Sequence, residues 1–307
     1  MGWEQSLRRL NWLRGPSAVE RAVDSERCLR AVPRSASLCI ASGKGGTGKS
    51  VVTASLGELF SSRGRTLIVD ADMGVGNAHI LQDVSPPHSF VDVVQGRCSV
   101  ADARVACSPR LDLIGAGSGV SQMAALSGYE LHVIARGLLE LEAEYDFVIV
   151  DSAAGISEQT LHFACACDAV VVVTTPDLTA MTDGYAFMKV LHARRPDLQP
   201  MLIVNRAANE LEHDPEQHAE RVVERLSQVC HKFLRNAPRF VGAVPEDRNV
   251  VRSVAARRPV VRFAPGAPAA HGLQVISRAV LAELAQLPRR GVGRALGDVV
   301  GYVAANS

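Results

Sequence analysis

Residues 41–51 hold side chains whose types and spacing point most directly to chemistry. They contain Gly43-x-x-x-x-Gly48-Lys49-Ser50, the pattern of a loop that binds phosphate groups. The glycines let the backbone curl so that several N–H groups face one anion, and a following helix adds its positive N-terminal end. In such a loop the lysine reaches the β- and γ-phosphates, and the serine hydroxyl binds Mg²⁺. The alternative is a glycine-rich turn, but average composition produces this pattern in only roughly one chain of this length in a hundred.

The elements around this loop have the order that the chemistry requires. The apolar residues 38–40 predict a buried strand before it, and Val52, Leu56, Leu59 and Phe60 have helical spacing after it. We therefore predict a nucleotide site at the end of a strand and the start of a helix. The residues predicted to contact the phosphates are Gly43, Lys44, Gly45, Gly46, Thr47, Gly48, Lys49, Ser50 and Val51.

Carboxylates follow two further apolar runs. Residues 65–69 lead into Asp70 and Asp72, and residues 147–150 lead into Asp151. Carboxylates at the C-terminal ends of strands beside a phosphate loop lie where parallel sheets place their ligands. Asp72 would hold or deprotonate an attacking water, Asp70 would support Mg²⁺ or the loop, and Asp151 would hold Mg²⁺ directly or through water. The alternative for each is an aspartate that caps a turn or ends a strand by chance.

Two more strands are predicted at residues 169–173 and 201–204, and a final one at 240–244. Because their apolar runs are continuous, they are typical of parallel strands buried on both faces. The predicted fold class is α/β, with a doubly wound, mainly parallel sheet flanked by helices. Residues after the last two strands would contact the base, and these are Asn205, Arg206, Pro245, Glu246 and Asp247.

The composition limits the class of protein. The chain has 307 residues, a formal net charge of +1, and 47% hydrophobic residues, which is ordinary for a soluble globular protein. The seven cysteines are scattered without a Cys-x-x-Cys pair, so reduced thiols in a cytosolic protein are favoured over disulfides or a metal site. No apolar stretch approaches the roughly 20 residues of a membrane span, and no signal-peptide core precedes residue 35. We expect a cytoplasmic protein.

Both ends of the chain differ from its centre, so we divide it into a leader (1–35), a nucleotide-binding domain (36–287) and a tail (288–307). The leader has seven arginines against four acids, and it could be a disordered segment or a peptide that docks on a partner. The tail has an apolar helical face beside arginines, which could lie on anionic lipid or pack on the core.

Lys44 adds a resemblance to a known family. The sequence Lys44-Gly-Gly-Thr-Gly-Lys49-Ser resembles the deviant phosphate loop of the MinD/ParA ATPases, in which the early lysine reaches the partner's ATP. Asp70-Ala-Asp72-Met-Gly and Asp151-Ser-Ala-Ala-Gly resemble the two switch segments of that family, and the resemblance covers about residues 37–285. Within the family, the chain looks most similar to the FlhG group (also FleN or YlxH), which sets flagellar number and placement.

This resemblance implies an activity, cofactors and partners. It implies hydrolysis of ATP to ADP and phosphate with Mg²⁺, with Lys44, Lys49, Asp72 and Asp151 as catalytic residues and Ser50, Asp70 and Asp151 at the metal. It further implies an ATP-bound homodimer at the inner face of the cell membrane, held there by the tail. Residues 1–14 would contact an FlhF-type GTPase, since Glu4-Gln5-Ser6-Leu7-Arg8 is similar to the start of the group's activating peptide. Flagellar C-ring and transcription-regulator proteins are further partners that the group suggests.

Two related functions remain open. A MinD-like division regulator shares the core, but its N-terminus starts almost directly at the first strand. A ParA-like protein binds DNA through basic surface residues, for which Arg252, Arg257, Arg258 and Arg262 are candidates, and salt-dependent DNA binding would reveal it. The net charge of +1 does not favour DNA as a partner.

Overall fold

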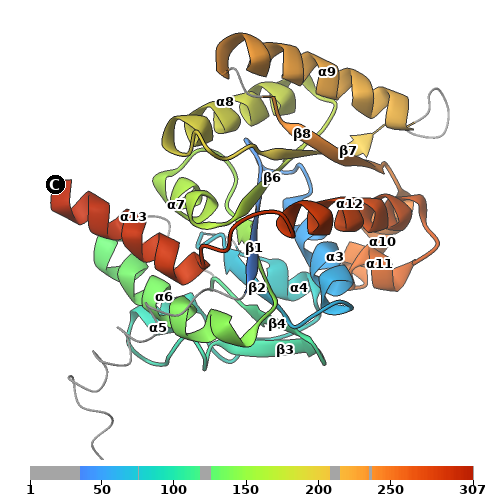
Figure 1. Ribbon diagram of the computed structural model, residues 1–307. Coiled ribbons are helices and arrows are strands. Elements are labelled where there is room, and N and C mark those ends of the chain that lie inside the picture. The colour runs from blue at the N-terminus through green and yellow to red at the C-terminus, as the bar shows by residue number, and fades with distance from the viewer. Residues whose placement is uncertain (1–34, 75, 118–125, 208–214, 235–236, 307) are drawn as a thin grey trace, which may run out of the picture. The chain divides into compact units, whose positions relative to one another are not determined.

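The computed structural model describes residues 35–74, 76–117, 126–207, 215–234 and 237–306, which form one sheet with helices on both faces (Figure 1). The strands are β1 (Ala36–Ala41), β2 (Thr66–Ala71), β3 (Arg104–Ser108), β4 (Leu111–Ile114), β5 (Phe147–Ser152), β6 (Ala169–Thr174), β7 (Met201–Ala207) and β8 (Arg239–Pro245). The helices are α3 (Lys49–Ser61), α4 (Ala78–Leu81), α5 (Phe90–Val94), α6 (Gly128–Leu141), α7 (Glu158–Ala166), α8 (Leu178–Arg194), α9 (Pro215–Leu234), α10 (Arg248–Ala255), α11 (Val260–Phe263), α12 (Pro268–Leu284) and α13 (Val292–Asn306), with a 3-10 turn at Glu142–Glu144.

The strand order is β3-β4-β2-β5-β1-β6-β7-β8, and every neighbouring pair is parallel except β3 and β4. The strand β1 lies between β5 and β6. The helix α3 connects β1 to β2, on the β5 side of β1, and α7 connects β5 to β6, on the opposite side of β1. Open α/β sheets bind their ligands at such a point, outside the carboxyl ends of the strands. The loop after β1 occupies this place. The predicted doubly wound, mainly parallel sheet is therefore confirmed.

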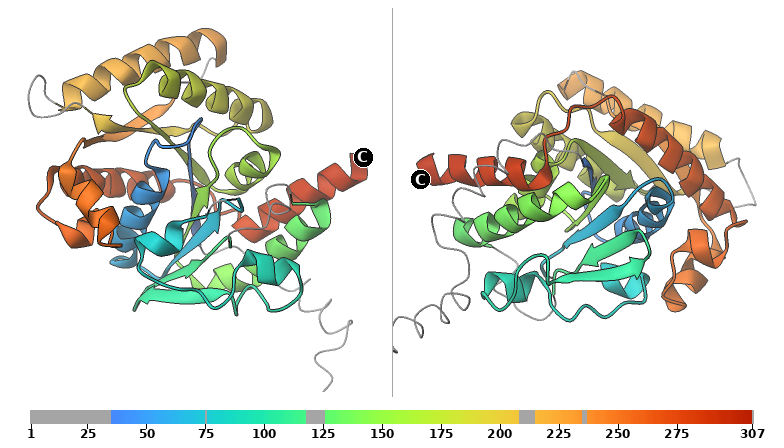
Figure 2. Two further views of the ribbon diagram at one scale, coloured as in Figure 1. Left: turned by 180° about the vertical axis from the view of Figure 1, so that it is seen from behind. Right: turned by 60° about the horizontal axis from the view of Figure 1, so that its bottom comes forward.

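Side chains alternate between two core clusters on the two faces of the sheet. In β1, Leu38 and Ile40 belong to the cluster beneath α3, α11 and α12, whereas Cys39 and Ala41 belong to the cluster beneath α6, α7 and α8. This alternation follows from the two-residue period of a strand. Because both faces are covered, every residue of β1 is buried, and this explains why the parallel strands read as continuous apolar runs. Figure 2 shows the two helical layers from behind and from below.

The first turns of α13 are built into the second of these layers. Val292 and Leu296 have no exposed surface, and α13 packs on α6 and α7. The helices α13 and α6 approach so closely at Gly293 that a Cβ atom there would lie 2.6 Å from the Ala135 carbonyl oxygen. In this structure, residues 292–296 of the tail therefore pack on the core, which is one of the two alternatives for the tail.

A buried carboxylate holds the start of α13. The Gly293 N–H donates to Glu142 Oε2 at 3.3 Å, and only 4% of Glu142 is exposed. Burial raises the pKa of Glu142 to about 7, although the backbone N–H groups of Gly293 and Val292 oppose the shift. The carboxylate satisfies backbone donors that a helix start leaves without intrahelical partners.

Some predictions concern residues that the structure does not describe, or describes only in part. The leader, apart from Ser35, lies outside the described residues, and so does Cys28 within it. Six described cysteines are free thiols: Cys39, Cys98, Cys107, Cys165, Cys167 and Cys230. Among the described residues, no helix is both long and apolar enough to cross a membrane.

Candidate nucleotide-binding site

The loop between β1 and α3 has the backbone conformation that the glycines predict. Gly46 and Gly48 have φ angles of 79° and 94°, in the left-handed region that favours glycine, and Gly48 immediately precedes α3. Gly43 leaves no room for a side chain because a Cβ atom there would collide with the backbone of Asp183 in α8. The loop therefore curls tightly at the N-terminus of α3, where an anion is favoured.

Lys49, Ser50 and Asp151 come together at this helix start. The Ser50 side chain is hydrogen-bonded to Asp151, and Thr53 Oγ1 donates to Asp151 Oδ1 at 3.0 Å. Lys49 is 8% exposed; burial lowers its pKa, while the carboxylates of Asp151 and Asp72 raise it. The sequence analysis missed Thr53, although its position one helical turn after Ser50 was a usable signal.

Asp70 and Asp72, both at the end of β2, have different environments. Asp70 is fully buried, and its two oxygens accept hydrogen bonds of 3.1 Å from the backbone N–H groups of Asp72 and Ala78. Asp72 is only half-buried and lies close enough to Lys49 to affect its pKa. Asp70 thus closes the loop that carries Asp72, and its place at the metal stays a prediction.

The buried acids make the site suitable for a divalent cation. Burial raises the pKa of Asp70, and the neighbouring Asp151 raises it further. Burial also raises the pKa of Asp151, against the opposing effects of the Ser50 hydrogen bond and the Lys49 charge. Mg²⁺ binds hydroxyl and carboxylate oxygens together with phosphate oxygens and water, so Ser50 and Asp151 fit it.

The segment after β5 contacts the phosphate loop through its backbone. The Gly155 N–H donates to the Ser42 carbonyl at 2.9 Å, and Gly155 has a φ of 88°. Ser152 Oγ, at the end of β5, donates to the Ile40 carbonyl at 3.0 Å, and Ser157 caps α7. A displacement of this segment would therefore act on both the phosphate loop and α7.

Lys44 has an intramolecular partner. Its Nζ donates to Thr179 Oγ1, in the first turn of α8, at 2.7 Å. The sequence analysis did not identify Thr179, and 135 residues of separation left it no local signal.

The residues predicted to contact the base have different environments in the structure. Asn205 Nδ2 donates to the Thr47 carbonyl at 2.7 Å, so this amide group supports the phosphate loop. Asp247 accepts from the N–H groups of Asn249 and Ala269, so its carboxylate joins the starts of α10 and α12. Arg206 is exposed and has a φ of 53°, unusual for a residue with a side chain. Pro245 ends β8, and the N–H of the next residue, Glu246, donates to the Ala207 carbonyl at 3.0 Å.

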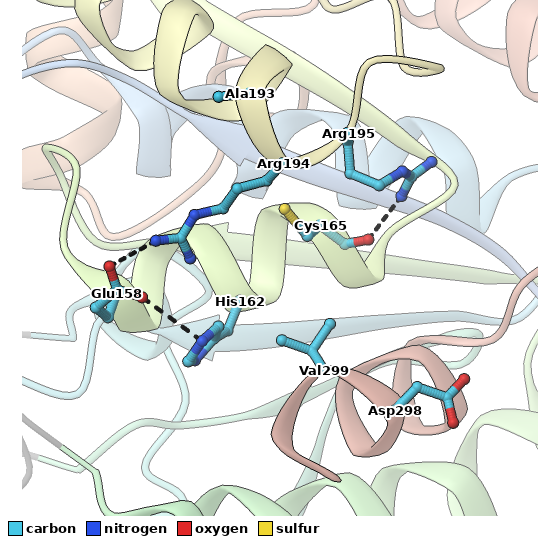
Figure 3. A pocket seen from close by; sticks show the side chains of 8 residues that line it. All are labelled: Glu158, His162, Cys165, Ala193, Arg194, Arg195, Asp298 and Val299. Atoms are coloured by element: carbon cyan, nitrogen blue, oxygen red, sulfur yellow. Dashed lines mark hydrogen bonds and ion pairs between the residues drawn. The ribbon is translucent and has the colours of Figure 1, made fainter. Parts of the chain in front are cut away.

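A separate cavity of about 640 Å³ lies between α7, α8 and α13 and contains no phosphate-loop residue (Figure 3). Arg194 Nη2 donates to Glu158 Oε1 at 2.6 Å, and Arg195 Nη1 donates to the Cys165 carbonyl at 2.7 Å. These contacts fasten the end of α8 to α7. The cavity thus extends along α7 from Glu158 to Cys165 and is bordered by the ion pair of Glu158 with Arg194.

Comparison with known proteins agrees with this geometry. The model of the CobQ/CobB/MinD/ParA nucleotide-binding domain matches residues 38–260. The chain is 28% identical over 244 residues to the antiactivator FleN of Pseudomonas aeruginosa, covering 79% of this chain and 85% of the relative. It is 28% identical over 264 residues to the flagellum site-determining protein YlxH of Helicobacter pylori, covering 83% and 86%. The structure of the septum site-determining protein MinD from Pyrococcus horikoshii, complexed with Mg-ADP, has the same fold, with a TM-score of 0.65, 22% identity, and coverage of 81% of this chain and 97% of that one.

Proposed function

This chain belongs to the CobQ/CobB/MinD/ParA family of nucleotide-binding proteins, and we propose that its ATPase activity controls the number or placement of flagella. It is an ATPase whose cofactors are ATP/ADP and Mg²⁺. The flagellar role is supported by the two relatives described above. One is named as the antiactivator FleN, and the other as the flagellum site-determining protein YlxH. The observation that carries the proposal is that similarity to both extends over about four fifths of this chain.

Each residue of the site has a distinct task in hydrolysis. The phosphate loop and Lys49 bind the phosphate oxygens and draw charge away from the γ-phosphate. When bound, Mg²⁺ neutralises phosphate charge, and Ser50 and Asp151 are the residues that would hold it. Asp72 orients the attacking water, and Asp70 keeps Asp72 in place through the two backbone hydrogen bonds of its loop.

ATP binding is coupled to dimer formation through Lys44. In the dimer, Lys44 of each protomer contacts phosphates bound by the other, so the lysine must exchange its bond to Thr179 for a bond to phosphate. A charge-assisted bond to a phosphate is stronger than a bond to a neutral hydroxyl, and this difference favours the ATP-bound dimer. Hydrolysis removes the γ-phosphate and returns the protein to the monomer.

Contact with the membrane is proposed for the ATP-bound dimer, through the tail at 288–307. The apolar residues Val292 and Leu296 are buried on the core, so the tail would have to leave α6 in order to use them on lipid. Two tails on one dimer act as linked weak anchors and raise the affinity for a surface. The proposed partner of the leader is an FlhF-type GTPase, contacted by residues 1–14.

The test compares cells that carry the wild-type gene, a deletion, or the Lys49→Ala allele. We expect both altered strains to change the number or position of flagella on each cell while cell length and septum position stay normal. Minicells with unchanged flagella would assign the protein to division-site placement instead. In vitro, wild-type protein should sediment as a dimer with ATP, whereas Lys49→Ala should remain a monomer, and ATP-independent dimers would contradict the proposed switch.

The proposed contact of the leader with a GTPase has its own test in the full-length chain. The GTPase rate of the FlhF-type protein is measured with wild-type protein and with Gln5→Ala. We expect stimulation that the substitution removes. Equal stimulation by both proteins would exclude the leader as the activating segment.

A further inference from the structure

Helix α10 turns two of its three valines toward solvent, while the third, Val250, is partly buried against the core. Its inward face carries Ser253, which is 1% exposed and donates to the Val250 carbonyl at 2.8 Å. Its outward face carries Val251, which is 72% exposed, and Val254, which is 38% exposed. A surface helix of a globular protein normally turns its apolar residues inward. A local departure from this rule is typical of a functional surface.

Four arginines that have no ion-pair partner among the described residues surround these valines. Arg248 and Arg252 lie beside Val251 on the exposed face of α10, and Arg257 and Arg258 follow the helix directly. None of the four forms a salt bridge with any residue that the structure describes, whereas Arg262 in α11 pairs with Glu58 at 2.9 Å. The α10 patch, defined as Arg248, Val251, Arg252, Val254, Arg257 and Arg258, is therefore cationic with an apolar centre.

We propose that the α10 patch docks an acidic protein surface that carries an apolar side chain between its carboxylates. The arginines would form forked hydrogen bonds with carboxylates, and Val251 would enter an apolar site on the partner. This inference concerns a surface outside the nucleotide site and does not depend on the flagellar role.

Other occupants fit the patch less well. Two copies of α10 packed against each other would bring like charges together, which opposes a contact of the patch with itself. Nucleic acid would pair with the arginines, but the valines at the centre would gain little against phosphates and sugars. An anionic membrane attracts arginines too, although one short helix with two exposed valines inserts little apolar area. An acidic protein surface uses both features of the patch.

The test titrates the full-length protein against a fluorescein-labelled acidic helical peptide, in which leucines are spaced one turn apart among glutamates. A peptide with glutamine in place of glutamate is the neutral control. We expect the acidic peptide to bind, and to bind more weakly as the salt concentration rises, because exposed charges are screened. The neutral peptide should not bind measurably.

Matched variants locate the binding site. The double variant Arg248→Glu/Arg252→Glu should weaken binding at least about tenfold, and Val251→Asp should weaken it about fivefold. The control variants make the same changes on exposed positions of α9: Arg221→Glu/Arg225→Glu and Val229→Asp. They should leave the affinity within about twofold, and all variants should keep the wild-type ATPase rate, which shows that they fold.

Several results would overturn the proposal. Equal losses in the α9 and α10 variants would show that the peptide responds only to overall charge. Patch-dependent binding of a DNA duplex or of phosphatidylglycerol vesicles, without binding of the acidic peptide, would assign the surface to nucleic acid or lipid. Loss of the ATP-dependent dimer in Val251→Asp would make a second copy the occupant.

Discussion

The buried carboxylate at the start of α13 makes a quantitative prediction about stability and pH. The pKa of Glu142 rises from an ordinary value of 4.5 to about 7 in the folded protein. A carboxyl group whose folded pKa is raised binds more protons in the folded state, so it contributes stability below pH 4.5 that is lost as the pH rises to about 7. At 1.36 kcal/mol per pKa unit, this contribution amounts to about 3 kcal/mol over the full range.

The perturbation is Glu142→Gln, which cannot ionise and keeps an oxygen that can accept from the Gly293 N–H. Urea unfolding of both proteins at pH 5.5 and pH 8.0 gives the free energy of unfolding at each pH. Between these values, we expect the stability of the variant relative to wild type to increase by about 2 kcal/mol, because only wild type gains a buried charge. Taking the difference between two proteins cancels the titration of every other group.

A matched control separates burial from charge. Glu140→Gln removes a carboxylate whose side chain is 59% exposed, on the neighbouring helix α6, where it forms only a surface ion pair of 3.7 Å with Arg136. Its stability relative to wild type should change by less than about 0.5 kcal/mol between the two pH values. If Glu142→Gln behaves in the same way, the reasoning from burial is refuted.

Three further predictions concern the nucleotide site. Asp72→Ala should lower the ATPase kcat at least about 100-fold and accumulate ATP-bound dimers in sedimentation, and an unchanged rate would remove Asp72 from catalysis. Asp70→Asn should lower kcat about tenfold with little change in the KM for ATP, as a positioning residue predicts; a rise in KM alone would instead indicate a role in ATP binding. Thr179→Val should tighten the ATP-dependent dimer about 30-fold, because the Lys44 of each of the two protomers no longer gives up a hydrogen bond worth about 1 kcal/mol; an unchanged dimer Kd would show that this bond does not oppose assembly.

The elements that the sequence predicted well are those buried on both faces or strongly periodic. The apolar run at 169–173 matches β6 almost to the residue, and the runs at 201–204 and 240–244 lie within β7 and β8. The edge strand β3 was not predicted. The residues of β3 are mostly half-exposed and do not alternate clearly between buried and exposed positions. The antiparallel pairing of β3 with β4 also contains a bulge. The short helices α10 and α11 were also missed, since so few residues carry little periodic signal.

In the nucleotide site, the sequence could identify which residues take part but not their contacts. The spacing of Gly43, Gly48, Lys49 and Ser50 is local, so the pattern is visible along the chain. The bond of Lys44 to Thr179 and that of Asn205 to Thr47 join residues more than 130 positions apart, and only the strand order brings them together. The predicted base contact of Asn205 remains a prediction, with its amide bonded to the phosphate loop in this structure.

The central position of β1 has a consequence for synthesis of the protein on the ribosome. Its two neighbours, β5 and β6, begin roughly 100 residues or more later in the chain. At about 5–20 residues per second, β1 emerges many seconds before either partner strand exists. During that time the segment ASLCIA, which is entirely buried in the native fold, is an apolar strand with two open edges. The nucleotide site therefore forms late. Nascent chains that end before β6 lack this site, so ATP cannot bind to them and protect them from aggregation.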